Sequence, residues 1–174
     1  MPRRPSVRLL PAVLTMLAAA VLAGCTRAAP SASATLTPSP APGSSSEPVP
    51  DPLRGLAVVT VSLDGRPLRV AVADTNGARQ RGLMGVADLG PLGGLLFSYP
   101  AAVETSFHMR DVPIPLDIAF FDADGRLVTV LEMAVCEVEP CPSYRSPAPF
   151  RWALEAPAGD LAGLGLDARL SLAP

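Results

Sequence analysis

Residues 104–122 read ETSFHMRDVPIPLDIAFFD and bring charged side chains closer to an apolar run than any other part of the 174-residue chain. The stretch holds the only histidine, His108, and sets Arg110 beside Asp111. Two prolines then lead into Asp117 and a short apolar run, which predicts a buried strand. We therefore expect the fold to form around this strand and the polar site to lie next to it.

Asp117 stands between an Ile-Pro bend and this strand, so we expect its carboxylate to be partly buried. A buried charge is costly unless it is paired or hydrogen-bonded. Arg110 is the nearest candidate partner in the sequence, and backbone N–H groups of the bend are the other. Two roles stay open at this point, because Asp117 can clamp the bend or face a ligand.

Outward from this strand, residues 53–174 form the predicted β-rich domain. Segments rich in Val, Leu and Phe alternate with turn signals that contain Gly, Pro and Asp, and the strands predicted in this way cover residues 56–63, 68–73, 95–99, 118–121, 126–135, 150–156 and 168–172. A short helix over residues 78–84 follows an N-cap at Asp74 or Thr75, and residues 157–166 are predicted to be helical or a turn. The pattern favours a mainly β fold, a small β-sandwich or barrel of seven to eight short strands with one or two short helices, rather than βαβ units.

Within residues 150–156, apolar and other residues alternate. The alternation predicts that Arg151, Ala153 and Glu155 share one face of a strand. Phe150 and Trp152 are then expected on the opposite face.

Residues 1–24 have the pattern of a bacterial lipoprotein signal peptide: a basic start, an apolar segment too short to span a membrane comfortably, and Leu-Ala-Gly before Cys25. The segment Leu22-Ala23-Gly24-Cys25 resembles a lipobox, which implies that Cys25 carries lipid. The alternative is an ordinary signal peptide. Residues 25–52 follow as the lipidated cysteine and a disordered linker rich in Pro, Ser and Ala. We therefore expect an extracytoplasmic protein, anchored to the outer face of the cytoplasmic membrane through its lipid.

Cys136 and Cys141 are left as a pair if Cys25 is lipidated. Disulfides persist outside the cytoplasm, so the sequence predicts a structural disulfide between these two residues.

The charge and the missing motifs exclude several classes of function. Residues 53–174 hold 10 Arg and 14 acidic residues, a net charge of −4, which argues against nucleic acid as a partner. A single histidine excludes zinc motifs built on several histidines, and neither a Gly-x-Ser-x-Gly elbow nor a Gly-rich phosphate loop occurs. The sequence therefore predicts no catalytic residue, no metal and no cofactor.

Several motifs, taken in order, resemble the domain of unknown function 192 family. They are Arg81-Gly82-Leu83-Met84, Gly94-Leu95-Leu96-Phe97, Phe107-x-Met109-Arg110-Asp111, Ile114-Pro115-Leu116-Asp117-Ile118-Ala119-Phe120, Cys141-Pro142-x-Tyr144 and Leu154-Glu155-Ala156-Pro157-Ala158-Gly159. The resemblance covers residues 56–172 and implies a small β-rich domain, often exported, without an established activity. Members of this family usually carry Trp, Lys and Asn where this chain has His108, Arg110 and Asp111, so the resemblance implies an aromatic position rather than a catalytic one for His108.

The candidate polar site, for a ligand or for structure, consists of Arg81, His108, Arg110, Asp111, Asp117 and Glu155. Arginine side chains suit carboxylates, phosphates and sugars, and Arg79, Arg81 and Arg110 could form a small cationic site. The leading hypothesis is a non-catalytic β domain that binds a small anionic or carbohydrate ligand, or an envelope protein.

Two other functions are compatible with the sequence. The first alternative is an envelope hydrolase that uses Asp117 and Arg110, or two carboxyl groups among Asp111, Asp117 and Glu155. The lesser alternative is a soft-metal site for copper, for which the chain offers Met84, His108, Met109, Met133, Cys136 and Cys141.

Overall fold

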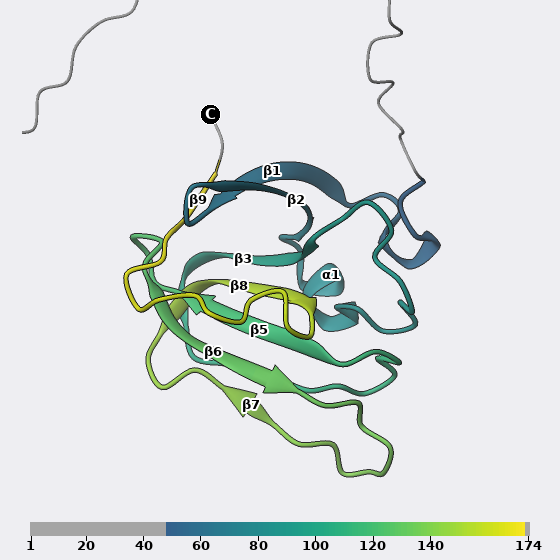
Figure 1. The fold of residues 1–174 in the computed structure, drawn as a ribbon. Helices are drawn as coiled ribbons and strands as arrows, with labels where there is room; N and C mark the ends of the chain where they lie inside the picture. Colours follow the sequence, from purple (N-terminus) through teal and green to yellow (C-terminus); the bar gives the residue numbers. More distant parts are fainter. Residues whose placement is uncertain (1–47, 173–174) are drawn as a thin grey trace, which may run out of the picture. The chain divides into compact units, whose positions relative to one another are not determined.

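The computed structural model describes residues 48–172, and in this range the chain is mainly β, as the sequence predicted (Figure 1). Its elements are the 3-10 helix η1 (Asp51–Leu53), the helix α1 (Asn76–Arg81), and the strands β1 (Ala57–Leu63), β2 (Arg66–Ala73), β3 (Gly94–Val103), β4 (Ser106–Phe107), β5 (Leu116–Phe121), β6 (Leu127–Met133), β7 (Tyr144–Arg145), β8 (Phe150–Pro157) and β9 (Leu170–Leu172). The prediction of seven to eight strands is close to this number. Residues 1–47, with the predicted signal peptide, Cys25 and most of the linker, lie outside the described residues.

Seven of the strands form one curled sheet in the order β6-β5-β8-β3-β2-β1-β9, and β4 pairs with β7 in a separate two-stranded sheet (Figure 1). The C-terminal segment links the two edges of the large sheet. Arg169 forms an isolated bridge with Arg126, and the Leu127 N–H donates to the Ala168 carbonyl oxygen at 3.0 Å, while Leu170 begins β9 beside β1. The curled sheet is therefore a half-barrel, whose two edges are joined, within the described residues, by the C-terminal segment alone.

The first hairpin follows directly from its turn residues. Asp64 and Gly65 both have positive φ, +50° and +79°, which is the conformation that a two-residue type I′ hairpin turn requires. β1 and β2 pair in antiparallel register across this turn.

The next connection differs from the expectation. β2 pairs with β3 in parallel, and α1 forms the crossover between them, so one βαβ unit occurs where the sequence favoured none. The helix also begins earlier than predicted and ends at Arg81, because the Thr75 side chain accepts a hydrogen bond from the Ala78 N–H and Gly82, at φ +51°, ends it. The crossover brings α1 beside β3, and this arrangement creates the cavity described below.

The predicted core strand is β5, whose six residues are all buried between β8 and β6. Its residues alternate between two packed faces. On one face, buried residues of the sheet pack with the segments that follow α1 and β4: Leu95, Phe97, Ile118, Phe120, Ala153, Phe150, Leu83, Val86, Phe107, Met109 and Val112. On the other face, sheet residues pack with the C-terminal segment: Leu96, Ala119, Phe121, Leu154, Ala156, Leu161, Ala168 and Leu170.

Two further details of the strands differ from the predictions. β3 continues beyond Pro100 to Val103, because the register between β3 and β8 shifts in this stretch and the ladder there does not need the missing proline N–H. Phe150 packs on the same face as Ala153 rather than with Trp152, next to the same irregularity. In the segment predicted to be helical or a turn, residues 158–163 form turns directly after β8.

Candidate functional site

A cavity of about 330 Å³ lies between α1, β3, β4 and β8. Its lining combines charged, aromatic and aliphatic side chains, namely Asn76, Arg79, Gln80, Arg81, Leu83, Met84, Phe97, Tyr99, Thr105, Ser106, Phe107, His108, Val112 and Glu155, together with Gly82. Small-molecule sites commonly enclose roughly 300–1,000 Å³ and combine apolar walls with a few polar groups. This volume is therefore at the small end of that range.

Packing holds the walls of the cavity in place. Phe107 of β4 packs edge-on against Phe97 of β3, with ring centroids 5.0 Å apart, and against Phe120 of β5 at 5.5 Å. Gly82 ends α1 at φ +51°, a conformation that favours glycine, and a Cβ at this position would be in van der Waals contact with the Phe97 ring of β3 at 3.4 Å. The aromatic contacts fix β4, and with it His108, beside the end of the helix.

Arg79 forms the polar side wall. Its Nη1 donates to the carbonyl oxygens of Asp74 and Ser98 at 2.5 and 2.8 Å, and its Nη2 donates to the Asn76 Oδ1 at 2.6 Å. The guanidinium also lies over the Tyr99 ring, 4.9 Å from the centroid. A guanidinium has five N–H donors, so two remain after these three bonds.

Glu155 of β8 contributes the one acidic group of the cavity, and only 5% of its surface is exposed. It sits in the sheet between Leu95 of β3 and Ile118 of β5. Within residues 48–172, no hydrogen bond or ion pair reaches its carboxyl group. Every side-chain oxygen of these residues that is sealed from solvent has a hydrogen-bond partner. The Glu155 carboxyl oxygens have no partner, so they are not sealed from solvent and open onto the cavity.

Burial raises the pKa of Glu155 from 4.5 to about 8, because the charged form loses its hydration and gains no partner. The carboxyl group therefore carries a proton at neutral pH. In the unfolded chain it ionises near its ordinary pKa, so its contribution to stability is fully present below about pH 4.5 and is lost as the pH rises through about 8. At about 1.4 kcal/mol per unit of pKa shift, this loss is a few kcal/mol.

The pKa of Tyr99, which also lines the cavity, is shifted as well. Its half-buried position raises the pKa of its hydroxyl, the Arg79 charge opposes that shift, and Glu155 adds to it. The Tyr99 hydroxyl is therefore neutral over the physiological range, and it lies within electrostatic reach of Arg79 and Glu155.

Arg81 and His108 are exposed residues that also line the cavity. Arg81 has no salt bridge with any residue in the described range. The Nδ1 atom of His108 accepts a hydrogen bond from the Arg110 backbone N–H at 3.4 Å, so the neutral ring carries its proton on Nε2. Both side chains can thus offer N–H donors to a ligand.

Arg110 takes no part in this cavity. Its Nε donates to the Glu139 Oε1 at 2.6 Å in an exposed ion pair. The hydrogen bond raises the pKa of Arg110 and lowers the pKa of Glu139, with a backbone hydrogen bond from Cys141 adding to the latter shift. Asp111 is exposed at φ +57°, and its carbonyl oxygen accepts the Gly85 N–H at 2.8 Å.

Asp117 is buried, with 2% of its surface exposed, and its Oδ2 accepts the backbone N–H groups of Gly159 at 2.8 Å and Leu161 at 3.3 Å. The predicted pairing with Arg110 is therefore wrong. The donors are backbone groups, but they come from the turn after β8 and not from the proline bend. A hydrolase site made of Asp117 and Arg110 is not assembled, because each group has another partner.

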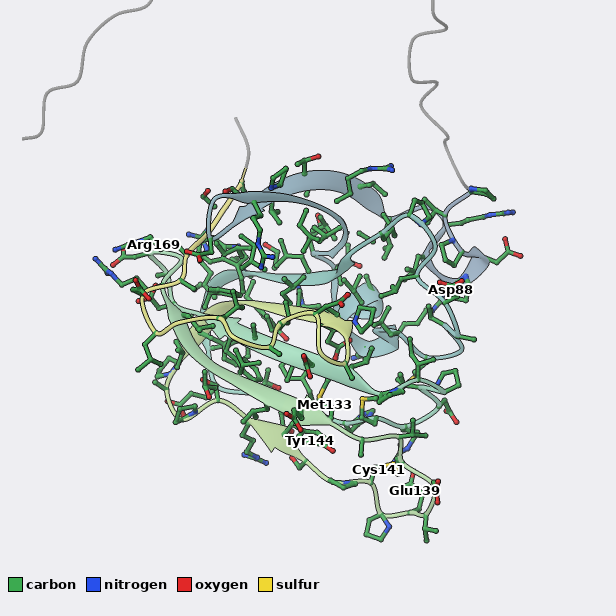
Figure 2. The ribbon with its side chains drawn as sticks, viewed as in Figure 1. Asp88, Met133, Glu139, Cys141, Tyr144 and Arg169 are labelled. Atoms are coloured by element: carbon green, nitrogen blue, oxygen red, sulfur yellow. A yellow bond between two sulfur atoms is a disulfide. The ribbon has the colours of Figure 1, made fainter. Side chains whose placement is uncertain are left out.

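The predicted disulfide between Cys136 and Cys141 is confirmed, with Cα atoms 5.5 Å apart. Figure 2 shows Cys141 and Glu139 together on the loop that projects beyond β7. The bond consumes both thiols of the suggested copper site. Among the other candidates, Met84 and His108 line the cavity, whereas Met109 is buried in the core.

Met133, labelled in Figure 2, lines a different and larger groove of about 820 Å³ beside β5 and β6. Tyr144, labelled next to it, and Asp117 also line this groove. The soft-metal ligands are therefore divided between separate places, and residues 48–172 contain no group of three or more His, Cys, Asp or Glu side chains that could hold a metal ion.

Of the six predicted site residues, the cavity brings together Arg81, His108 and Glu155. Arg110, Asp111 and Asp117 lie outside it. Sequence reasoning missed Tyr99 and the position of Arg79 above it; the only available signal was the Arg79–Arg81 cluster at the end of the predicted helix.

The family of the chain follows from comparison with known proteins. Residues 59–172 match the family DUF192, described as an uncharacterized ACR. The chain belongs to the DUF192 family. Its matched region contains every strand of the large sheet at least in part, and the whole cavity.

Two crystal structures resemble this DUF192 chain. One is a protein from Sinorhizobium meliloti 1021, provisionally described as a transcription regulator, with 30% identity, a TM-score of 0.59, and coverage of 67% of this chain and 95% of that one. The other is a protein of unknown function from Novosphingobium aromaticivorans DSM 12444, with 26% identity, a TM-score of 0.62, and coverage of 73% and 94%. No curated protein matched the sequence.

Proposed function

We propose that this DUF192 protein is an exported, lipid-anchored envelope protein whose β domain binds a small ligand in the cavity beside α1 and catalyses no reaction. The anchor rests on the lipobox-like residues that end at Cys25. The disulfide supports an oxidising location outside the cytoplasm. The part of the chain that the structure describes has no helix long and apolar enough to cross a membrane.

One observation carries the binding role: Glu155 is a nearly buried carboxyl group that faces a cavity and has no partner within residues 48–172. Buried polar groups are normally hydrogen-bonded, and leaving one unpaired costs stability. Such a cost is typical of functional sites, where activity is retained at the expense of stability. A bound ligand would supply the missing partner.

The ligand is a small anionic or carbohydrate molecule. Arg79 and Arg81 put positive charge at the cavity, and the volume of about 330 Å³ excludes a large partner from its interior. The regulatory description of the Sinorhizobium protein does not extend to this domain, whose net charge of −4 suits nucleic acid poorly.

The test replaces Glu155 with Met in the detergent-solubilised full chain and compares the free energies of unfolding in denaturant. Because the carboxyl group has no structural partner, Glu155→Met should leave stability unchanged or raise it. Leu154→Ala on the same strand is the matched control, and it should lower stability by roughly 2–5 kcal/mol as a core truncation. A loss of similar size for Glu155→Met would show that the carboxyl group supports the fold, and would refute its binding role.

A further inference from the structure

We propose, resting on the binding role above, that the ligand is a small carboxylate with a compact apolar body, held between the Glu155 carboxyl group and the guanidinium of Arg81, which line the same cavity. The ligand class follows from three properties of the same cavity: its charges, its hydrogen-bond donors that have no acceptor within the described residues, and its apolar walls.

The charges that face the cavity are predominantly positive. Arg79 and Arg81 belong to α1, and His108 directly follows β4. Glu155 is the one acidic side chain in the lining. Since Glu155 is protonated at neutral pH, the lining then carries the two arginine charges without a compensating carboxylate. A cationic ligand would approach both arginines and would require Glu155 to ionise in a nearly buried position, at a cost in desolvation.

The hydrogen-bonding groups are mostly donors. Protonated Glu155 offers one O–H, Arg79 retains two N–H groups, and Arg81 and His108 offer further N–H groups from the rim. A carboxylate has two oxygens and only accepts hydrogen bonds, so it complements this set. The bond from a carboxylic acid to a carboxylate is charge-assisted and is therefore stronger than a bond to a neutral acceptor such as a sugar hydroxyl.

Apolar side chains line much of the remaining cavity. Leu83, Phe97, Phe107 and Val112 are buried core residues whose surfaces also line it. With about 330 Å³ available, the cavity accommodates one ring or a short branched chain behind the carboxylate. Benzoate and isovalerate are suitable probes, since both join a carboxylate to such a body.

Affinity for a carboxylate should depend on pH through the Glu155 carboxyl group. Ionisation of Glu155 removes the O–H donor and places a negative charge next to the ligand carboxylate, so affinity falls as the pH rises past the pKa of about 8. The other charged or titratable groups that face the cavity are Arg79, Arg81, Tyr99 and His108. The raised pKa of the Tyr99 hydroxyl keeps this group neutral, so it does not oppose the effect.

The experiment titrates the detergent-solubilised full chain with benzoate, isovalerate, benzamide and benzylamine, and follows backbone amide shifts by NMR. The two carboxylates should shift residues around the cavity, with benzamide and benzylamine at least about tenfold weaker. From about pH 6.5 to about pH 9.5, benzoate affinity should fall by at least about tenfold, because the protonated fraction of Glu155 falls by more than that.

Variants separate the contribution of Glu155 to benzoate binding from that of Arg81. Glu155→Gln keeps an N–H donor in place of the O–H, so it should still bind benzoate but with a much flatter pH dependence. Arg81→Gln should weaken benzoate binding severalfold, whereas Arg169→Gln, an exposed arginine outside the cavity, should not. Figure 2 shows Arg169 at the edge of the domain away from the β7 loop.

Tighter binding of benzylamine or benzamide than of benzoate at this cavity would overturn the ligand class and leave the binding role in place. Failure of both carboxylates to shift any cavity residue would also overturn the class. Failure of the binding role itself has a different signature, because it appears as a loss of stability in Glu155→Met without any ligand present.

Discussion

Replacing Asp117 by Asn tests how the core strand is tied to the turn after β8. The Asp117 Oδ2 accepts both backbone N–H groups, from Gly159 and Leu161. The amide oxygen of Asn can occupy the same position, so the shape and both bonds persist while the charge is lost. Asp117→Ala removes the acceptor altogether and leaves two N–H groups without it.

The magnitude follows from the two bonds. Hydrogen bonds to charged groups contribute about 1.5–3 kcal/mol each, and neutral bonds about 0.5–1.5 kcal/mol. The difference is roughly 1 kcal/mol per bond, so Asp117→Asn should lower the free energy of unfolding by about 2 kcal/mol. The bond from Leu161 is longer, at 3.3 Å, and therefore contributes the smaller share. Asp117→Ala should cost more, about 3–4 kcal/mol, because it abolishes both bonds.

A double-mutant cycle by denaturant unfolding on the detergent-solubilised full chain provides the assay. Since Arg110 pairs with Glu139 and not with Asp117, the effects of Asp117→Asn and Arg110→Ala should add. The matched cycle of Arg110→Ala with Glu139→Ala should show coupling, because these two side chains share one ion pair. An unchanged midpoint for Asp117→Asn would refute the clamp, and coupling between Asp117 and Arg110 would refute the partners described here.

Two further predictions concern cysteines. Cys136→Ser together with Cys141→Ser should lower the free energy of unfolding by roughly 2 kcal/mol, as expected for a bridge that closes a short loop, and an unchanged midpoint would contradict this. Cys25→Ser should release the chain from the membrane fraction and abolish the mass of the lipid, whereas a variant that stays with membranes at an unchanged mass would disprove the anchor.

Several features of the fold could be predicted from the sequence because they depend on local chemistry. The Asp64-Gly65 turn requires positive φ at both residues, and the chain supplies residues that tolerate it. The apolar run after Asp117 became the fully buried strand β5. The two cysteines are close in the sequence and lie on one loop, so their bond required no knowledge of the fold.

The partners of Asp117 could not be predicted, because they depend on contacts between distant segments. Gly159 and Leu161 lie 42 and 44 residues further along the chain and meet Asp117 only through the pairing of β5 with β8. Arg110 is close in sequence, but Glu139, which lies 29 residues further along, provides its partner. Proximity along the chain was thus the wrong guide to both pairings.

The parallel pairing of β2 with β3 was missed for a related reason. A six-residue helix between two short strands contributes little periodic signal, and the turn residues around it are compatible with an antiparallel fold. The site depends on this crossover, since α1 supplies Arg79 and Arg81. Glu155 was recognised as a polar candidate, but its strand alternation could not show that both faces of β8 are buried.

The central claim is that Glu155 is an unpartnered carboxyl group at the ligand cavity. Its titration tests this claim most directly, by NMR of side-chain carboxyl carbons in the full chain labelled with ¹³C-glutamate, with Glu155→Gln used to assign the resonance. We predict a midpoint near 8 in the absence of ligand, since burial without a partner disfavours the charged form. A midpoint near the ordinary value of 4.5 would contradict the account, because the carboxylate would then be solvated or paired.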